Sequence, residues 1–431
     1  MTPFVVFVPS AAEQIARPAA AGSTTVTLSV PAGLAASPFD SARSVTVPGG
    51  WSAAVWARVP GARFLLWTPQ GNLLVSAASS GQVVELFRGA SGTQTREQVL
   101  ASGLSLPQGL AFDTLGGREV LYVAESDEID RYLWRSNGSL GARTVVVRNL
   151  PDASSAGDDV HRLKGIAIGP DHTIYVTAGS ADNATPRASS PPRATILAYR
   201  SSGAFLRVYA RGVRNGEGLA FAPDGSLWTA VNERDQIPYP FHRSYGGSGD
   251  AYGQVITAYV NEHPPDELAK LTPGRNLGWP YCNPDPDVTH GSSSTAYTFA
   301  NLPFDDDQQN NPNGSVLNCA GLAPLERGLP AHSAPLGLTF LERSRVPGGW
   351  SQGAVVAVHG SWDRTPPRAP AVLWLPWVAS KHTLGSPKVL LGGFQDSSGA
   401  RWGRPTDAVA GPDGAVYVAD DQAGAIYRLA P

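Results

Sequence analysis

The stretch HRLKGIAIGPDHTIYVTAGSADN, residues 161–183, decides the fold. It reads as a histidine in a loop, a short apolar strand at 165–168, a Gly-Pro-Asp turn, and a second strand at 173–178 that leads into polar residues. A strand–turn–strand unit of this kind cannot bury both its faces alone, and similar units recur along the chain. We therefore expect it to be one unit of a radial β array, in which the histidine has a defined place.

Six units of this type follow one another along the sequence. They fall within residues 63–86, 108–133, 161–199, 217–230, 335–375 and 407–429. The turn prolines of the third and fourth units, Pro170 and Pro223, lie 53 residues apart, which suits one blade of four strands with its loops. The sequence therefore predicts an all-β, six-bladed β-propeller whose N-terminal strands help to close the last blade.

The rest of the chain divides around these units. Residues 1–24, rich in Ala, Pro and Ser, predict a loose tail, and residues 25–431 a single propeller domain. Residues 232–330 predict an insertion after the central strands of the fourth unit. At about a hundred residues it is far longer than an ordinary connection, which favours a functional role. Within it, PDELAKL at 265–271 has a helix-like composition.

Composition restricts the class of protein. Counts of 47 Gly and 37 Pro, with 42% hydrophobic and 16% charged residues, favour a turn-rich globular protein. The net charge of −3 and the scattered Lys and Arg residues give no footprint for nucleic acid. No stretch approaches the roughly 20 apolar residues that span a bilayer. The first residues lack the basic segment of a signal peptide.

Cys282 and Cys319 are the only cysteines. They lie in one loop-like region without metal-site spacing, which favours a disulfide over two free thiols. Such a bond would stabilise the fold by about 3–4 kcal/mol in the chain-entropy treatment. It would also favour a periplasmic or extracellular location.

Several polar residues share one position in the repeat. His161 and Arg214 each lie nine residues before the turn proline of their own unit, and Asn215 and Arg404 each lie eight before theirs. Gln108 falls just ahead of the corresponding strand in the second unit. Because the loops that enter the innermost strands of a propeller converge on one mouth of its channel, these side chains should ring a single funnel.

That set of residues suits proton transfer beside an anionic ligand. An imidazole with a pKa near ~6.5 can accept a proton near neutrality, and arginines bind carboxylates in a bidentate manner. Taken singly, each arginine could be a solvated loop residue and the histidine a structural one. The register shared by three units favours the functional interpretation.

Other candidates lie in the loops around the fourth and fifth units. Glu233 and Asp235, with nearby backbone carbonyls, could form a calcium site, although an internal salt-bridge turn explains them equally well. Arg364 is expected near the ligand, whereas His359 is expected to pack or to act behind it. Phosphate-binding glycine loops, GxSxG and HExxH motifs are absent, so nicotinamide, nucleotide and serine-hydrolase chemistry lose their usual support.

At these residues the sequence resembles the PQQ-dependent glucose/sorbosone dehydrogenase family, soluble six-bladed propellers that use pyrroloquinoline quinone (PQQ) and calcium. The resemblance covers about residues 50–431 and is closer to the sorbosone branch. Its most specific elements are RNGEGLAF from residue 214, GWPYC from 278 and HGSWDR from 359; weaker ones are the loop of residue 161 with GPDHTIYVTAGSADN, NERD from 232, HSAPLGL from 332 and RPTD from 404.

The resemblance implies roles at the matching positions. His161 corresponds to the general base that takes a proton from a sugar hydroxyl. Arg214 and Asn215 correspond to residues over the reactive edge of the quinone, and Gln108 and Arg404 to polar contacts near it. The protein would oxidise a sugar or a related alcohol, a small-molecule substrate, and pass electrons to an external acceptor.

The resemblance also implies a calcium ion held largely by backbone carbonyls after the fourth blade's second strand. Here Glu233, Arg234 and Asp235 replace the Gly-Pro turn of the glucose-oxidising members. Two alternatives remain open. One is a calcium-dependent propeller hydrolase or lactonase, which needs acidic or amide ligands converging on the channel. The other is a carbohydrate-binding propeller without catalysis, which would show no perturbed pKa at His161.

Overall fold

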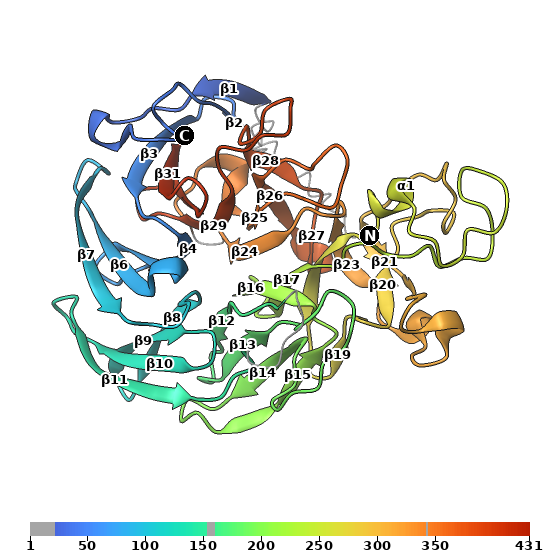
Figure 1. Ribbon diagram of the computed structural model, residues 1–431. Helices are drawn as coiled ribbons and strands as arrows, with labels where there is room; N and C mark the ends of the chain where they lie inside the picture. The colour runs from blue at the N-terminus through green and yellow to red at the C-terminus, as the bar shows by residue number, and fades with distance from the viewer. Residues whose placement is uncertain (1–21, 153–159, 342–343) are drawn as a thin grey trace, which may run out of the picture.

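The computed structural model of the protein describes residues 22–152, 160–341 and 344–431. Six β-sheets surround a central axis (Figure 1). Their innermost strands are β4 (Ala62–Trp67), β8 (Leu110–Leu115), β12 (Ile166–Ile168), β16 (Asn215–Phe221), β24 (Pro335–Phe340) and β29 (Pro405–Ala410). These strands contact one another in that order, and β29 contacts β4, so the ring is closed. The predicted six-bladed β-propeller is confirmed.

Each blade continues outward as an antiparallel sheet. The first three blades add β5 (Leu73–Ala77), β6 (Gln82–Arg88) and β7 (Gln94–Ser102); β9 (Arg118–Ala124), β10 (Ile129–Trp134) and β11 (Leu140–Val147); and β13 (Ile174–Ala178), β14 (Thr195–Tyr199) and β15 (Phe205–Arg211). The last three add β17 (Leu227–Asn232), β18 (Asp266–Leu271), β23 (Leu325–Leu329) and β21 (Ala300–Leu302); β25 (Gly353–Val358), β26 (Ala371–Val378), β27 (Thr383–Leu384) and β28 (Lys388–Leu391); and β30 (Val416–Asp420) and β31 (Ala425–Ala430).

An N-terminal strand completes the sixth blade, as the sequence predicts. Strand β3 (Ser52–Arg58) pairs antiparallel with β31, and Ser52 lies opposite Ala430. A two-stranded sheet of β1 (Ser23–Thr27) and β2 (Ser44–Pro48) precedes β3. Most of the tail predicted for residues 1–24 lies outside the described residues, but Ser23 and Thr24 already belong to β1.

Burial on both faces explains why the second strand of a blade reads as an uninterrupted apolar run. Every residue of β5 and of β30 is buried, because adjacent blades cover both faces of the sheet. The large side chains Trp228 and Tyr417 are fully buried in such strands. The core is therefore divided among the interfaces between neighbouring blades.

Three strands of the fourth blade, β18, β23 and β21, lie within the predicted insertion at 232–330. Strand β18 pairs with β17 on one side and with β23 on the other. The helix-like interpretation of 265–271 was wrong, because this segment completes backbone hydrogen bonds with both neighbouring strands. Apart from β19 (Arg275–Asn276), which pairs with β15, and β21, the remaining segments, 233–265 and 272–324, project from the propeller as a lobe that includes α1 (Thr257–Val260) and β20 (Cys282–Pro284) (Figure 1).

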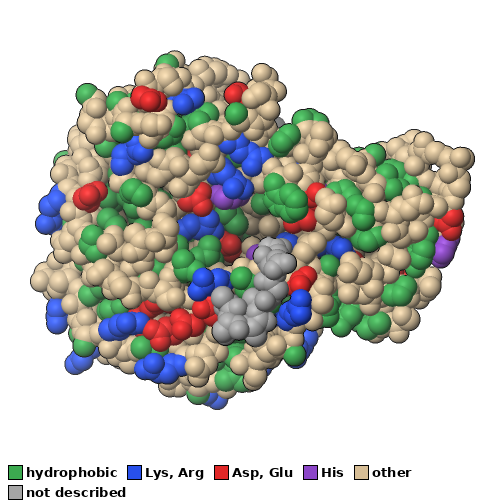
Figure 2. Space-filling view, viewed as in Figure 1, with side chains coloured by type: hydrophobic (Ala, Val, Ile, Leu, Met, Phe, Trp, Pro, Cys, Tyr) green, Lys and Arg blue, Asp and Glu red, His purple; other side chains and the backbone are tan. Residues whose placement is uncertain are grey.

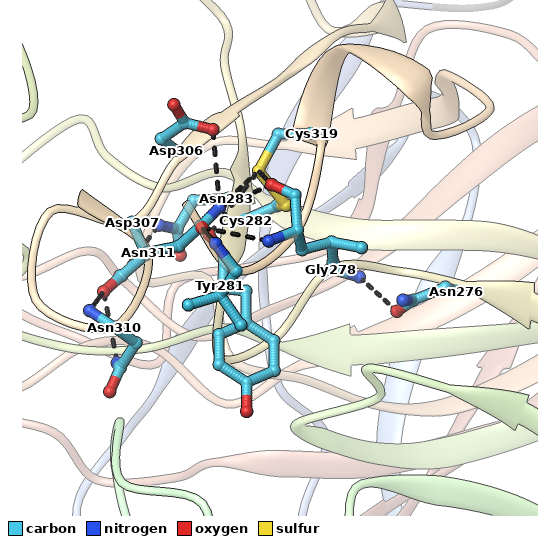
Figure 3. The surroundings of a disulfide bond; sticks show 12 residues. Asn276, Gly278, Tyr281, Cys282, Asn283, Asp306, Asp307, Asn310, Asn311 and Cys319 are labelled. Atoms are coloured by element: carbon cyan, nitrogen blue, oxygen red, sulfur yellow. Dashed lines mark hydrogen bonds between the residues drawn. A yellow bond between two sulfur atoms is a disulfide. The ribbon is translucent and has the colours of Figure 1, made fainter. Parts of the chain in front are cut away.

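The predicted disulfide is present in this lobe. Cys282 and Cys319 are bonded, with their Cα atoms 5.6 Å apart (Figure 3). The bond joins β20 to a 3-10 turn at Cys319–Gly321, and β20 itself pairs with β22 (Phe304–Asp306). Within the described residues, we find no helix with the length and apolarity required to cross a bilayer.

Candidate active site

The loops that enter the innermost strands meet at one mouth of the central channel. A cavity of about 580 Å³ opens there. Its charged and imidazole side chains are Arg63, His161, Arg162, Glu217, His359, Arg404 and Asp421. Figure 2 shows basic, acidic and histidine side chains gathered at the central hollow of the propeller. The channel mouth therefore concentrates ionisable groups.

His161 lies five residues before β12 and is anchored to the exit of β13. Its backbone N–H donates to the Ser180 carbonyl at 3.0 Å, and its Nδ1 lies 3.0 Å from the Ser180 hydroxyl oxygen. The Ser180 hydroxyl itself donates to the Asp182 carbonyl, so it accepts from Nδ1–H. This assignment makes Nε2 the nitrogen that carries the lone pair. A Cβ at Gly179 would lie 2.5 Å from the Cβ of His161, so only glycine permits this approach.

The surroundings of His161 keep its imidazole neutral. Burial lowers the pKa of His161 well below its ordinary value, and the positive charge of Arg214 lowers it further. A neutral imidazole with the lone pair on Nε2 can act as a general base at neutral pH.

Arg214 lies behind His161, and only 1% of its surface is exposed. Its Nε donates to the Asn183 carbonyl at 3.0 Å and its Nη1 to the Asn232 carbonyl at 3.2 Å. Its Nη2 lies 3.6 Å from a carboxylate oxygen of Asp235. Arg214 therefore acts on His161 through its charge, while its guanidinium fixes the surrounding loops.

The other predicted cofactor contacts occupy the mouth at two depths. Arg404 lines the cavity, and its Nε donates to the His359 carbonyl at 2.8 Å. Gln108 and Asn215 are buried behind residues that line the cavity: Gln108 accepts a hydrogen bond from Arg63, and Asn215 donates one to Glu217. The Nε2 of Gln108 is buried without a hydrogen-bond partner among the described residues, which leaves an unsatisfied donor beside the cavity.

Arg364 does not reach the cavity. Its guanidinium donates to the carboxylate of Glu262 at 2.7 Å, to the Asn261 carbonyl at 3.2 Å and to the Pro366 carbonyl at 2.6 Å. The expectation that it contacts the ligand is therefore corrected: its charge is used to hold the lobe segment at 261–262 against the loop after β25.

A chain of ion pairs across the channel escaped sequence analysis. Arg63 bridges Glu217 at 2.5 Å and Asp421 at 2.9 Å, and Asp421 accepts from His359 Nε2 at 2.9 Å. Although burial opposes it, the hydrogen bond from His359 and the charge of Arg63 lower the pKa of Asp421 to about 2.

The positions of Asp421 and His359 relative to the strands could have predicted that both lie at this mouth. Asp421 follows β30 directly, and His359 follows β25 directly, so both occupy the exit of a blade's second strand. That exit faces the same mouth as the entry to the innermost strand, because the two strands are antiparallel. Glu217 lies inside β16, and no motif distinguishes it.

The predicted metal ligands separate into three environments. The Arg234 side chain is bound to Asp307 at 2.5 Å, and a guanidinium cannot ligate a metal, so Arg234 could contribute only its backbone carbonyl. The Glu233 carboxylate is buried without a hydrogen-bond partner among the described residues, and burial raises the pKa of Glu233 to about 8. Asp235 lies with His332 and Asp363, and their ligand atoms are all within 4.8 Å of one another.

The cluster of Asp235, His332 and Asp363 suits a divalent cation. Two carboxylates supply the hard oxygen ligands that calcium prefers, and Asp235 connects the cluster to Arg214. Asp235 is one of the metal ligands that the sequence predicts. His332 and Asp363 come from the fifth blade's loops and were not expected as ligands.

Comparisons with known proteins identify a family for the chain. A family model described as TrAA12-like matches residues 45–431. An uncharacterized protein of Borreliella burgdorferi is 26% identical over 260 residues, covering 59% of this chain and 56% of that protein. The chain therefore spans about half the length of the curated relative that it matches.

Solved structures share the fold at low sequence identity. The holo form of the pyranose dehydrogenase PQQ domain from Coprinopsis cinerea has a TM-score of 0.71 and 20% identity, and covers 90% of this chain and 97% of its own. The calcium structure of the Trichoderma reesei AA12 protein has a TM-score of 0.70 and 19% identity, with 88% and 95% covered. The PQQ-bound aldose sugar dehydrogenase of Streptomyces coelicolor has a TM-score of 0.54 and 18% identity, with 89% and 99% covered.

Proposed function

Because the chain belongs to the TrAA12-like family, we propose that it is an oxidoreductase that uses PQQ to oxidise a sugar or a related alcohol. The observation that carries this proposal is His161: a neutral imidazole, with its lone pair assigned to Nε2, at the edge of a cavity that also contains arginines. The fold of the chain, which resembles that of PQQ-dependent sugar dehydrogenases, also supports the proposal.

The cavity suits a planar tricarboxylate such as PQQ. Its volume of about 580 Å³ lies in the usual range for cofactor sites. Arg404 and Arg162 supply positive charge at its lining, and the unsatisfied Nε2 of Gln108 offers a buried donor. We assign these three residues to cofactor binding. When bound, PQQ would supply a two-electron acceptor for the substrate.

The chain's own residues would carry the proton and hold the charges. Nε2 of His161 accepts the hydroxyl proton of the substrate, and Nδ1–H remains on the Ser180 hydroxyl, which fixes the ring. Burial, reinforced by the charge of Arg214, lowers the pKa of His161 and so keeps it neutral beforehand. Asp235, His332 and Asp363 would hold calcium, which supplies Lewis-acid character near the site.

Location and organisation complete the proposal. The disulfide between Cys282 and Cys319 supports a periplasmic or extracellular location. We also propose that residues 25–431 fold as one domain and that electrons leave to an external acceptor.

A titration of purified protein with PQQ and calcium tests the proposal. Stoichiometric uptake, followed by visible absorbance, and reduction of an electron-accepting dye on adding an aldose would support it. The double variant Arg404→Ala/Gln108→Ala should weaken uptake, whereas Arg200→Ala, at an exposed turn of the third blade, should not. Absence of uptake by a folded protein would overturn the proposal, and lactone hydrolysis would then be assayed.

A further inference from the structure

The lobe contains a cavity of its own, of about 430 Å³. One wall comes from the segment after β17 and carries Phe241 and Tyr252, which belong to a Gly-, Ser- and aromatic-rich run. The other wall comes from β22 and the loop that follows it. No lining residue is shared with the cavity of His161. The site is therefore distinct from the one assigned to PQQ.

We propose that the lobe cavity binds a neutral saccharide. His242 stacks on one face of Tyr252 and Arg243 lies over one face of Phe241, which leaves the other face of each ring for the C–H face of a sugar ring. Carboxyl and amide groups offer both acceptors and donors for hydroxyls; they belong to Asp305, Asp306, Gln308, Asn313 and Asn318. Among the described residues that line this cavity, none is Lys, Arg or His, so nothing there attracts an anion.

The size of the cavity argues for a molecule rather than an ion. A volume of about 430 Å³ lies within the range of small-molecule sites, far above the space that a single cation needs. The lining is also rich in polar groups, which suits a polyhydroxylated ligand better than an apolar one.

The wall formed by β22 is held in place before any ligand arrives. Asp306 pairs with Cys282 across the two strands, and Cys282 is bonded to Cys319, which lines the same wall of the cavity. Asn311 donates to the Leu317 carbonyl at 2.7 Å and so closes the loop between β22 and Cys319. Binding therefore costs little ordering of this wall.

Glycine backbones press against two of the polar side chains. A Cβ at Gly314, where φ is +65°, would lie 3.1 Å from an oxygen of Asp306. A Cβ at Gly253, where φ is +77°, would lie 3.1 Å from the amide nitrogen of Gln308. Because glycine has no Cβ, the backbone leaves room for both side chains at these two positions.

The protonation state of the acids agrees with a neutral ligand. Burial, together with the nearby Asp285, raises the pKa of Asp305 to about 8. Burial also raises the pKa of Asp306. Asp305 therefore carries a proton at neutral pH and can donate it in a hydrogen bond to a hydroxyl oxygen.

The test is calorimetric titration of the protein, without PQQ, with neutral cello-, xylo-, malto- and chito-oligosaccharides of about four to six units. We expect at least one series to bind with a dissociation constant of about 1 mM or tighter. Phe241→Ala and Gln308→Ala should each weaken that binding at least about fivefold. The matched exposed residues give the controls Phe205→Ala and Gln98→Ala, which should leave it unchanged.

Two results would overturn the inference: no binding by any series, or binding that survives both lobe variants with unchanged affinity. Circular dichroism and thermal unfolding identify a variant that fails to fold, and the near-isosteric Asp306→Asn then replaces it. Calcium is titrated separately, and calcium binding that Asp306→Asn abolishes, with no saccharide binding, would show a cation site instead. Because PQQ is absent throughout, failure here is distinguishable from failure of the proposed dehydrogenase activity.

Discussion

The two ends of the central channel differ in chemistry although the same strands form both. The mouth at His161 is lined by charged and imidazole groups. The opposite end opens into a larger hollow of about 700 Å³, lined mostly by apolar side chains such as Leu66, Leu219 and Phe340. Along β16, Glu217 lines the charged mouth and Leu219, two residues later, lines the apolar hollow. The chemistry of the lining, rather than the size of the hollow, distinguishes the candidate active site.

Loss of the base should give the largest effect. In the PQQ-loaded protein, His161→Ala should lower kcat about 10²–10⁴-fold, because proton transfer from the substrate loses its acceptor. Steady-state dye reduction measures it, and thermal unfolding should be unchanged. The control His172→Ala removes an exposed histidine on a turn at the apolar end, paired with Asp113, and should keep full activity. Near wild-type turnover in His161→Ala would remove this residue from the mechanism.

Breaking the ion-pair chain should chiefly affect stability. Arg63→Met leaves the carboxylates of Glu217 and Asp421 without their shared cation, which should lower the free energy of unfolding by about 3–5 kcal/mol. Urea unfolding measures the change. The double variant Arg63→Met/Glu217→Gln should recover part of the loss. A loss below about 1 kcal/mol would show that the chain contributes as little as an exposed pair.

At the apolar end, Leu219→Ala should lower the free energy of unfolding by about 3 kcal/mol, because it removes packing contacts and enlarges the hollow that Leu219 lines. The value of kcat/KM should stay unchanged. A matched reduction in activity would mean that the two ends are coupled, and the contrast between them would lose its functional meaning.

The smallest effect expected is a shift in pH dependence. The cation of Arg214 contributes to the lowered pKa of His161, so Arg214→Met should raise that pKa. Because the base works when neutral, the acid limb of the kcat/KM profile should move to higher pH. Arg211→Met, at an exposed position on β15, provides the control. A shift to lower pH, or none, would contradict this electrostatic role.

The periodic part of the molecule could be predicted from sequence. Distances of nine and eight residues before the turn proline predicted that His161 and Arg404 lie at the same mouth, and the structure places both there, with Gln108 and Asn215 just behind them. The same reasoning could not find the ion-pair chain, since Arg63 meets partners 154 and 358 residues away and charge pairing leaves no period.

The fourth-blade strand inside the predicted insertion, and the loop of the fifth blade that contacts the lobe, were the parts that sequence analysis described least well. Segment 265–271 has helix-forming residues, yet strand pairing on both sides determines its conformation. Arg364 lies in a motif that resembles one of the family, yet its guanidinium forms an ion pair with the carboxylate of Glu262. In both cases a long-range contact overrides what the local residues favour.

The closure of the sixth blade bears on how the protein is made. Strand β3 is synthesised early, but its partner β31 ends at Ala430. Until residues 425–430 leave the ribosome, β3 has an unsatisfied edge, and such edges invite pairing with other chains. The contact that closes the ring therefore forms last, between distant parts of the chain, and such long-range contacts slow folding. The edge of β3 is exposed to wrong pairing for most of the time that the chain is being translated.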